Sequence, residues 1–157
     1  MDIKNLLILF MIFALIALPI TVYLTYLDFN HSGDSFCDID DTFSCSTVSE
    51  SKYSRFLGVP VAVLGFLTYL FLFIMAFGVY RGWSFNRINK NLKREHILYI
   101  LAFVSGFGTV FSLYLTYAEF FWIKAFCVLC LTQQGLIMML FFLSLTAALF
   151  NKEMRLK

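Results

Sequence analysis

Four long apolar stretches alternate with polar segments along the chain. They cover residues 6–27, 59–80, 97–118 and 126–150. Each is close to the roughly 20 residues that a helix needs to cross a hydrocarbon layer about 30 Å thick, and none contains Asp, Glu, Lys or Arg. None shows the period-two alternation of a half-buried strand. A single stretch of this kind could be a buried core helix, but four in succession predict an all-α membrane protein: a four-helix bundle forming a single domain over residues 1–157.

The overall composition agrees with a lipid environment. The chain is 61% hydrophobic and 14% charged, and 20 of its residues are Phe. A soluble fold of this size could not bury so much apolar surface. The net charge of only +2 argues against nucleic-acid binding. We expect the first stretch to be retained as a helix, because its apolar body is too long for the core of a cleaved signal peptide.

Basic residues are concentrated on one side of the predicted bundle. Nine of the twelve Lys and Arg residues fall there: Lys4, Arg81, Arg87, Lys90, Lys93, Arg94, Lys152, Arg155 and Lys157. Basic residues mark the cytoplasmic side of a membrane protein. We therefore expect a multi-pass protein of the cell membrane whose two termini are both cytoplasmic. Residues 28–58 then form a long extracytoplasmic loop. We expect its outer face to be acidic, through Asp28, Asp34, Asp38, Asp40, Asp41 and Glu50.

A short pattern occurs twice in the chain. Residues 23–29 read YLTYLDF and residues 114–120 read YLTYAEF, and a cysteine follows each of them. We interpret the two segments as ends of equivalent helices in two halves of shared origin, both of which present thiols at the outer surface. Convergence is the alternative, because aromatic residues favour membrane interfaces in any case.

All four cysteines fall on the predicted outer side, which fits an oxidising compartment. Cys127 and Cys130 form a C-x-x-C motif that opens the fourth helix. This spacing places the two thiols one helical turn apart, close enough to bridge, at the boundary between water and lipid. Cys37 and Cys45 lie in the polar loop. One pair in water and one pair beside lipid suggest an electron relay by thiol–disulfide exchange, in which the loop pair must reach the C-x-x-C pair.

Three other readings of the cysteines stay open at this point. The four residues could form two structural disulfides in a membrane scaffold without catalysis. They could hold a zinc ion, although only one pair has a spacing typical of such sites. They could also be unrelated free thiols. We expect no metal site, because the sequence has no further metal-binding motif, and it has no phosphate-binding loop or Ser-His-Asp triad either.

Taken together, these residues resemble a known family. Cys37 and Cys45 at this spacing, the run SKYSRFLGVP over residues 51–60, and the C-x-x-C motif at the start of the last helix closely resemble the vitamin K epoxide reductase family. The chain is most similar to the prokaryotic homologues that lack a fused thioredoxin domain. The resemblance covers nearly the whole chain.

The resemblance implies a fold and an activity. The fold would be a four-helix bundle that encloses a quinone and is capped by the loop over residues 28–58. Cys37 would exchange with a separate thioredoxin-fold disulfide carrier, Cys45 would pass electrons to Cys127, and Cys130 would be the thiol nearest the quinone. The quinone would be a menaquinone or a ubiquinone, between which the sequence does not choose, and the reaction would support disulfide bond formation. The alternatives are a quinone epoxide reductase and the non-catalytic scaffold.

Three further side chains are candidates for quinone contacts. Tyr53 and Ser54 would approach the quinone from the loop, and Gln134 would approach it from the face of the fourth helix that carries Cys130. Vertebrate members of the family carry Asn where Ser54 aligns and Tyr where Gln134 aligns, which puts epoxide reduction in doubt for this chain. The alternatives are loop packing for Tyr53 and Ser54 and a helix–helix hydrogen bond for Gln134 and its neighbour Gln133.

Overall fold

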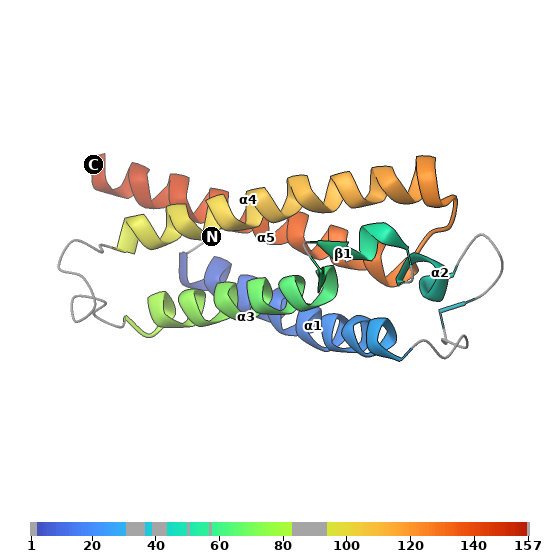
Figure 1. Cartoon of the computed structure of the whole chain (residues 1–157). Helices are drawn as coiled ribbons and strands as arrows, with labels where there is room; N and C mark the ends of the chain where they lie inside the picture. Colours follow the sequence, from blue (N-terminus) through green and yellow to red (C-terminus); the bar gives the residue numbers. More distant parts are fainter. Residues whose placement is uncertain are drawn as a thin grey trace.

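The computed structural model describes residues 3–30, 37, 38, 44–49, 51–56, 58–82 and 94–156. Its four long helices are α1 (Ile3–Phe29), α3 (Val61–Tyr80), α4 (Arg94–Ala118) and α5 (Val128–Leu156). All four are long and apolar enough to cross a membrane. The helices run side by side as one bundle, in which α5 packs against α1 and α4 while α3 packs against α1 (Figure 1). The prediction of an all-α protein with four membrane-spanning helices is confirmed.

Small side chains allow the helices to approach one another closely. Ala14 and Ala17 on α1, Ala76 on α3, and Ala147 on α5 are buried in the core of the bundle. A Cβ atom added to Gly106 on α4 would lie 2.9 Å from a ring carbon of Phe141 on α5. Such small residues are typical of helix contacts in membranes, where close packing replaces the hydrophobic drive of a soluble core.

Hydrogen bonds between hydroxyl groups also join α4 to α5. The side chains of Ser105 and Ser144 are buried, and their oxygen atoms lie 3.1 Å apart. One hydroxyl donates to the other, and the second donates to a carbonyl of its own helix, that of Leu101 for Ser105 or that of Phe141 for Ser144. Both oxygen atoms therefore keep hydrogen-bond partners although they are buried in the bundle.

Short elements cover the end of the bundle opposite the two termini (Figure 1). They are α2 (Cys45–Ser49), the 3₁₀ turn η1 (Lys52–Ser54), and a small hairpin of β1 (Arg55–Phe56) and β2 (Val59–Pro60). The strands are antiparallel, with Phe56 opposite Val59. Gly58 closes the hairpin at a φ of +84°, a conformation that glycine adopts without the strain of a Cβ atom. We call these four elements the cap.

The cap is tied to α1 through Asp28, and this corrects one expectation. Asp28 is not part of an acidic outer face, because α1 continues to Phe29 and leaves the Asp28 side chain only 3% exposed. Its carboxylate lies 3.6 Å from the guanidinium of Arg55 and accepts a hydrogen bond from Ser54. Asp38 accepts hydrogen bonds from the backbone and side chain of Ser46. The remaining acids of the predicted face, Asp34, Asp40, Asp41 and Glu50, lie outside the described residues.

Candidate active site

Cys37 forms a disulfide with Cys45, the first residue of the cap. Their Cα atoms are 5.8 Å apart, and both side chains are buried. Cys45 is the first residue of α2, so the disulfide joins this short helix to the segment that follows α1. The loop pair is therefore present in its oxidised form.

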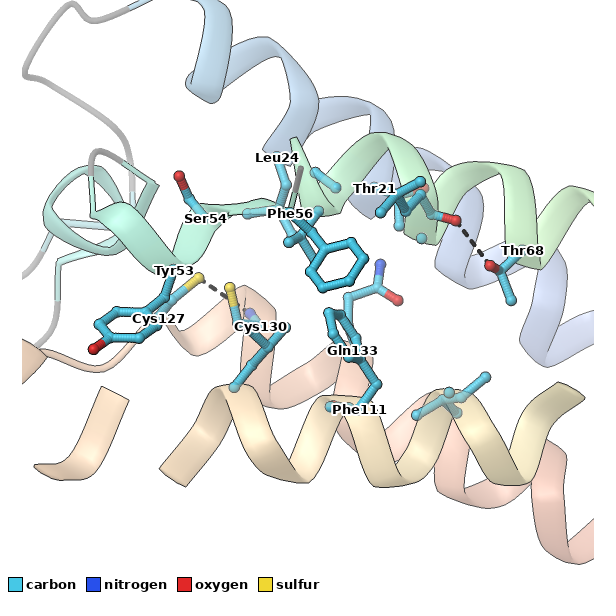
Figure 2. A pocket seen from close by; sticks show the side chains of 18 of the residues that line it. Thr21, Leu24, Tyr53, Ser54, Phe56, Thr68, Phe111, Cys127, Cys130 and Gln133 are labelled. Atoms are coloured by element: carbon cyan, nitrogen blue, oxygen red, sulfur yellow. Dashed lines mark hydrogen bonds between the residues drawn. The ribbon is translucent and has the colours of Figure 1, made fainter. Parts of the chain in front are cut away.

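Cys127 and Cys130 lie at the start of α5 as free thiols. The backbone N–H of Cys130 donates to the sulfur of Cys127 over 3.1 Å, because the two residues are separated by one helical turn. Cys127 is fully buried, whereas Cys130 is partly exposed. The C-x-x-C pair is thus in its reduced form, with the two sulfur atoms on the same side of α5 (Figure 2).

An irregular turn directs the chain from α4 into this pair. A π-helical turn, η3 (Glu119–Ile123), follows α4, and Lys124 ends it with a left-handed backbone at a φ of 56°. The N–H of Lys124 donates to the carbonyl of Glu119 over 2.8 Å. Turns of this kind occur frequently at functional sites, because the extra residue changes the direction of the helix end.

The fold brings the two cysteine pairs together. Ser44, next to Cys45, donates its backbone N–H to the carbonyl of Phe126 over 3.1 Å. Cys37, Cys45 and Cys127 are all buried in one apolar cluster, which also contains Leu27, Val48 and Ala125. The loop pair and the C-x-x-C pair therefore lie in one buried region of the molecule.

A cavity of about 680 Å³ lies between the helices below the cap. Cys45, Cys127 and Cys130 all line it, and most of its other lining residues are apolar. Figure 2 shows the sulfur atoms of Cys127 and Cys130 close together, with the amide of Gln133 farther along the same wall. Cys45 of the loop pair and both residues of the C-x-x-C pair thus border a single, largely apolar space.

The cavity opens sideways between α3 and α4. Leu67 and Phe71 on α3 and Phe107 on α4 line the cavity, yet their side chains are 54%, 43% and 69% exposed. In a bilayer, these exposed faces of membrane-spanning helices would lie against lipid. An apolar molecule dissolved in the bilayer can therefore reach the cavity without crossing the cap.

The predicted contact residues separate into two groups. Tyr53 and Ser54 line the cavity from the cap. The Ser54 hydroxyl donates to the Ser51 carbonyl and approaches Asp28, and the Tyr53 ring packs 5.0 Å from the ring of Trp122. Gln134 does not line the cavity, and its side-chain oxygen accepts a hydrogen bond from Thr116 on α4.

Gln133 occupies the cavity wall in place of Gln134. Its side-chain nitrogen donates to the carbonyl of Ala17 on α1 over 2.8 Å, which fixes the direction of the amide. Its Oε1 atom is buried and has no hydrogen-bond partner among the residues that the structure describes. The Tyr69 hydroxyl donates to the backbone carbonyl of Gln133 over 3.0 Å.

Two buried carboxyl groups also line the cavity, and sequence reasoning assigned neither of them to the site. They are Asp28, already described, and Glu119, which is 3% exposed and accepts the backbone N–H of Cys127 over 3.4 Å. The two acids occupy the same position in the two copies of the YLTY pattern. That repeated position was the signal by which both could have been found.

The comparison with protein families agrees with this geometry. The family model described as the vitamin K epoxide reductase family matches residues 8–145. The matched region includes all four cysteines, the cap, and the residues that line the cavity. Family members are oxidoreductases. The chain therefore belongs to the vitamin K epoxide reductase family and is a multi-pass membrane oxidoreductase that uses cysteine disulfide chemistry.

Proposed function

We propose that this protein oxidises a separate, extracytoplasmic thioredoxin-fold carrier and reduces a membrane quinone, and so supports disulfide bond formation. The observation that carries the proposal is the shared cavity. Cys45 of the loop pair and both residues of the C-x-x-C pair line one apolar space that opens toward the lipid-facing surface between α3 and α4. A structural disulfide in a scaffold would need neither the second pair nor the cavity.

Each cysteine has a role in the proposed relay. A thiolate of the carrier attacks Cys37, which forms a mixed disulfide and frees Cys45 as a thiolate. The carrier's second thiol then attacks the carrier sulfur of this mixed disulfide, so the carrier leaves as a disulfide and Cys37 is freed. Cys45 then attacks Cys127 of an oxidised C-x-x-C pair, and Cys130 leaves as a thiolate. Cys37 attacks Cys45 in that mixed disulfide, which restores the Cys37–Cys45 bond and frees Cys127.

The cavity fits a quinone by size, polarity and access. A volume of about 680 Å³ falls within the usual range for ligand sites, which are mostly apolar with a few placed polar groups. The unpartnered Oε1 of Gln133 would accept a hydrogen bond from a hydroxyl of the reduced ring. Tyr53 and Ser54 would close the cavity on the cap side. When bound, a quinone accepts two electrons and two protons, and the protein holds it beside Cys130.

The distribution of charge supports an orientation in the membrane. Lys4 lies in the first turn of α1 and Arg81 follows the last residue of α3. Both of these helix ends lie at the end of the bundle that holds the termini, whereas α2, which begins at Cys45, lies at the opposite end (Figure 1). With the basic end in the cytoplasm, both termini are cytoplasmic and the two cysteine pairs are extracytoplasmic, where the carrier can reach Cys37.

The proposal is tested with purified protein in detergent, supplied with a soluble quinone analogue and either a small dithiol or a reduced thioredoxin-fold protein. Cys130→Ala should abolish quinone reduction with both reductants, because no thiol then remains to complete the C-x-x-C disulfide. Cys37→Ala should keep reduction by the small dithiol and lose reduction by the protein. Turnover of Cys130→Ala at the wild-type rate would refute the assignment.

A second measurement separates the enzyme from a scaffold. Free thiols of the reduced protein are alkylated before and after addition of quinone and are counted by mass spectrometry. The relay predicts that quinone removes the thiols of Cys127 and Cys130 from the alkylated pool. The bridges of a scaffold would not respond to quinone.

A further inference from the structure

We infer that Glu119 carries protons between the Cys127–Cys130 pair and the molecule that the pair reduces. The inference rests on the proposed function, and it gives this buried side chain a role in the same cavity. Oxidation of the pair breaks two S–H bonds and forms one S–S bond, so two electrons and two protons must leave. A quinone takes up both electrons and both protons as its two O–H bonds form. The protons therefore need a route across a largely apolar space.

Glu119 has the position that such a route needs. It lines the cavity together with Cys127 and Cys130, and its Oε2 atom accepts the backbone N–H of Cys127 over 3.4 Å. The π-helical turn that begins at Glu119 turns this side chain inward, leaving it 3% exposed. Its carboxyl group thus lies between the end of α4 and the residue at which the C-x-x-C motif begins.

The other acid of the cavity serves as an internal comparison. Asp28 occupies the equivalent position in the first copy of the repeat, but the cation of Arg55 lies 3.6 Å from its carboxylate, and Ser54 also approaches it. Glu119 forms no ion pair among the residues that the structure describes. The Asp28 carboxylate is therefore engaged by residues of the cap, whereas the Glu119 carboxyl group contacts the backbone of Cys127. Of the two acids, Glu119 is the one placed beside the C-x-x-C pair, where it can take up a proton that a thiol releases.

Apart from the two acids and the cysteines, the ionisable side chains that line the cavity are those of Tyr53 and Tyr69. The Tyr69 hydroxyl donates to a backbone carbonyl. In the cap, the Tyr53 ring packs against Trp122 of the turn η3. In the proposed step, Glu119 accepts the proton of one thiol and passes it to an oxygen of the acceptor. The regenerated carboxylate then transfers the second proton in the same way, so Glu119 is unchanged at the end of the cycle.

The test compares Glu119→Gln, Glu119→Asp and a control, Glu95→Gln, which changes the same chemical group at the far end of α4. Glutamine keeps an oxygen that can accept the Cys127 N–H but cannot carry a proton. We expect Glu119→Gln to lower kcat for quinone reduction about 100-fold, the lower end of what general acid–base catalysis contributes, with KM for the quinone little changed. Glu119→Asp should recover part of kcat, and Glu95→Gln should behave as the wild type.

A spectroscopic readout does not depend on turnover. Infrared difference spectra are recorded on quinone-free protein while the C-x-x-C pair is converted from dithiol to disulfide. We expect a carboxyl band that responds to this conversion, shifts in D₂O, disappears in Glu119→Gln and persists in Glu95→Gln. Identical spectra for Glu119→Gln and wild type would overturn the inference, as would a wild-type kcat in Glu119→Gln or an Asp variant no better than the Gln variant. If wild-type protein fails to reduce quinone, the proposed function itself is wrong. If only the results for the Glu119 variants differ from expectation, the cysteine relay stands and Glu119 does not transfer its protons.

Discussion

Gln133 and Gln134 are neighbours on α5 but face different parts of the molecule. The side chain of Gln133 lies on the cavity wall, held by the carbonyl of Ala17, whereas Gln134 contacts Thr116 on α4. Successive residues on a helix point about 100° apart, so a change of one position moves an amide from the cavity wall to a helix interface. Gln134 thus makes the helix–helix hydrogen bond, and Gln133 is the amide placed to meet a molecule in the cavity.

This division predicts different effects of two substitutions. Gln133→Leu removes the unpartnered Oε1 and should weaken binding of the reduced quinone about 2- to 13-fold, which corresponds to the ~0.5–1.5 kcal/mol of a typical hydrogen bond. Gln134→Leu should affect this affinity less, because its oxygen is directed at Thr116. Titration of each variant with a hydroquinone analogue, followed by intrinsic fluorescence, measures the affinities. A larger effect of Gln134→Leu would return the contact to Gln134.

Sequence reasoning at the residue scale was most specific where chemistry restricts the choice. Two cysteine pairs in one chain have few chemical roles, and the structure places Cys45, Cys127 and Cys130 along one cavity, with Cys37 bonded to Cys45. The sequence favoured Gln134 over Gln133, although positions three and four after Cys130 share its helix face equally well, and it is Gln133 that lines the cavity. Asp28 was assigned to the loop surface because acids usually lie in water, and the cation of Arg55 that accompanies it on burial is distant in sequence.

At the scale of elements, close contact between α4 and α5 positions Cys130 relative to Glu119. Gly106 allows this contact, because a Cβ atom at this position would lie 2.9 Å from the Phe141 ring. Gly135 on α5 has no atom within 4 Å of the equivalent point. The two glycines both lie inside membrane-spanning helices, so they form a matched pair that differs in packing alone.

Gly106→Leu should therefore destabilise the bundle by about 1–3 kcal/mol, the usual cost of overpacking a close contact. Gly135→Leu should stay within about 0.5 kcal/mol of the wild type, as surface substitutions generally do. Both changes remove a helical glycine, so the gain in helix propensity cancels when the variants are compared. Unfolding in mixed micelles with increasing denaturing detergent gives the two free energies. Equal stabilities would show that α4 and α5 do not need this contact.

At the scale of the whole molecule, the four long apolar helices could be predicted because a lipid bilayer restricts which segments can cross it. A spanning segment must satisfy its own backbone and exclude charge over about 20 residues, and this pattern is readable without any tertiary contact. The ends were less readable: α1 continues to Phe29, and α4 continues into the turn Glu119–Ile123. Both extensions carry buried acids that the cavity accommodates. Their burial depends on the cap and on α5, which no local pattern reveals.

Electrons can pass from the cap to the bundle only if the sulfur of Cys45 can bond to that of Cys127. Both side chains are buried in the same cluster and line the same cavity, so the double variant Cys37→Ala/Cys130→Ala should form a Cys45–Cys127 disulfide under mild oxidation. Removal of Cys37 and Cys130 leaves each remaining thiol without its usual partner, and the bond it forms is the mixed disulfide of the relay. Mass spectrometry of peptides under non-reducing conditions identifies the link.

The matched control is Cys45→Ala/Cys130→Ala, which leaves Cys37 and Cys127. Cys37 lies in the same buried cluster as Cys127 but is absent from the residues that line the cavity, so the relay predicts slower bridging in this variant. The order of the two rates tests which loop cysteine passes electrons to Cys127, because the relay assigns this step to the cysteine that forms a disulfide with Cys127 faster. Faster bridging by Cys37 would exchange the roles of the loop cysteines, and the docking site for the carrier would then be Cys45, which begins α2.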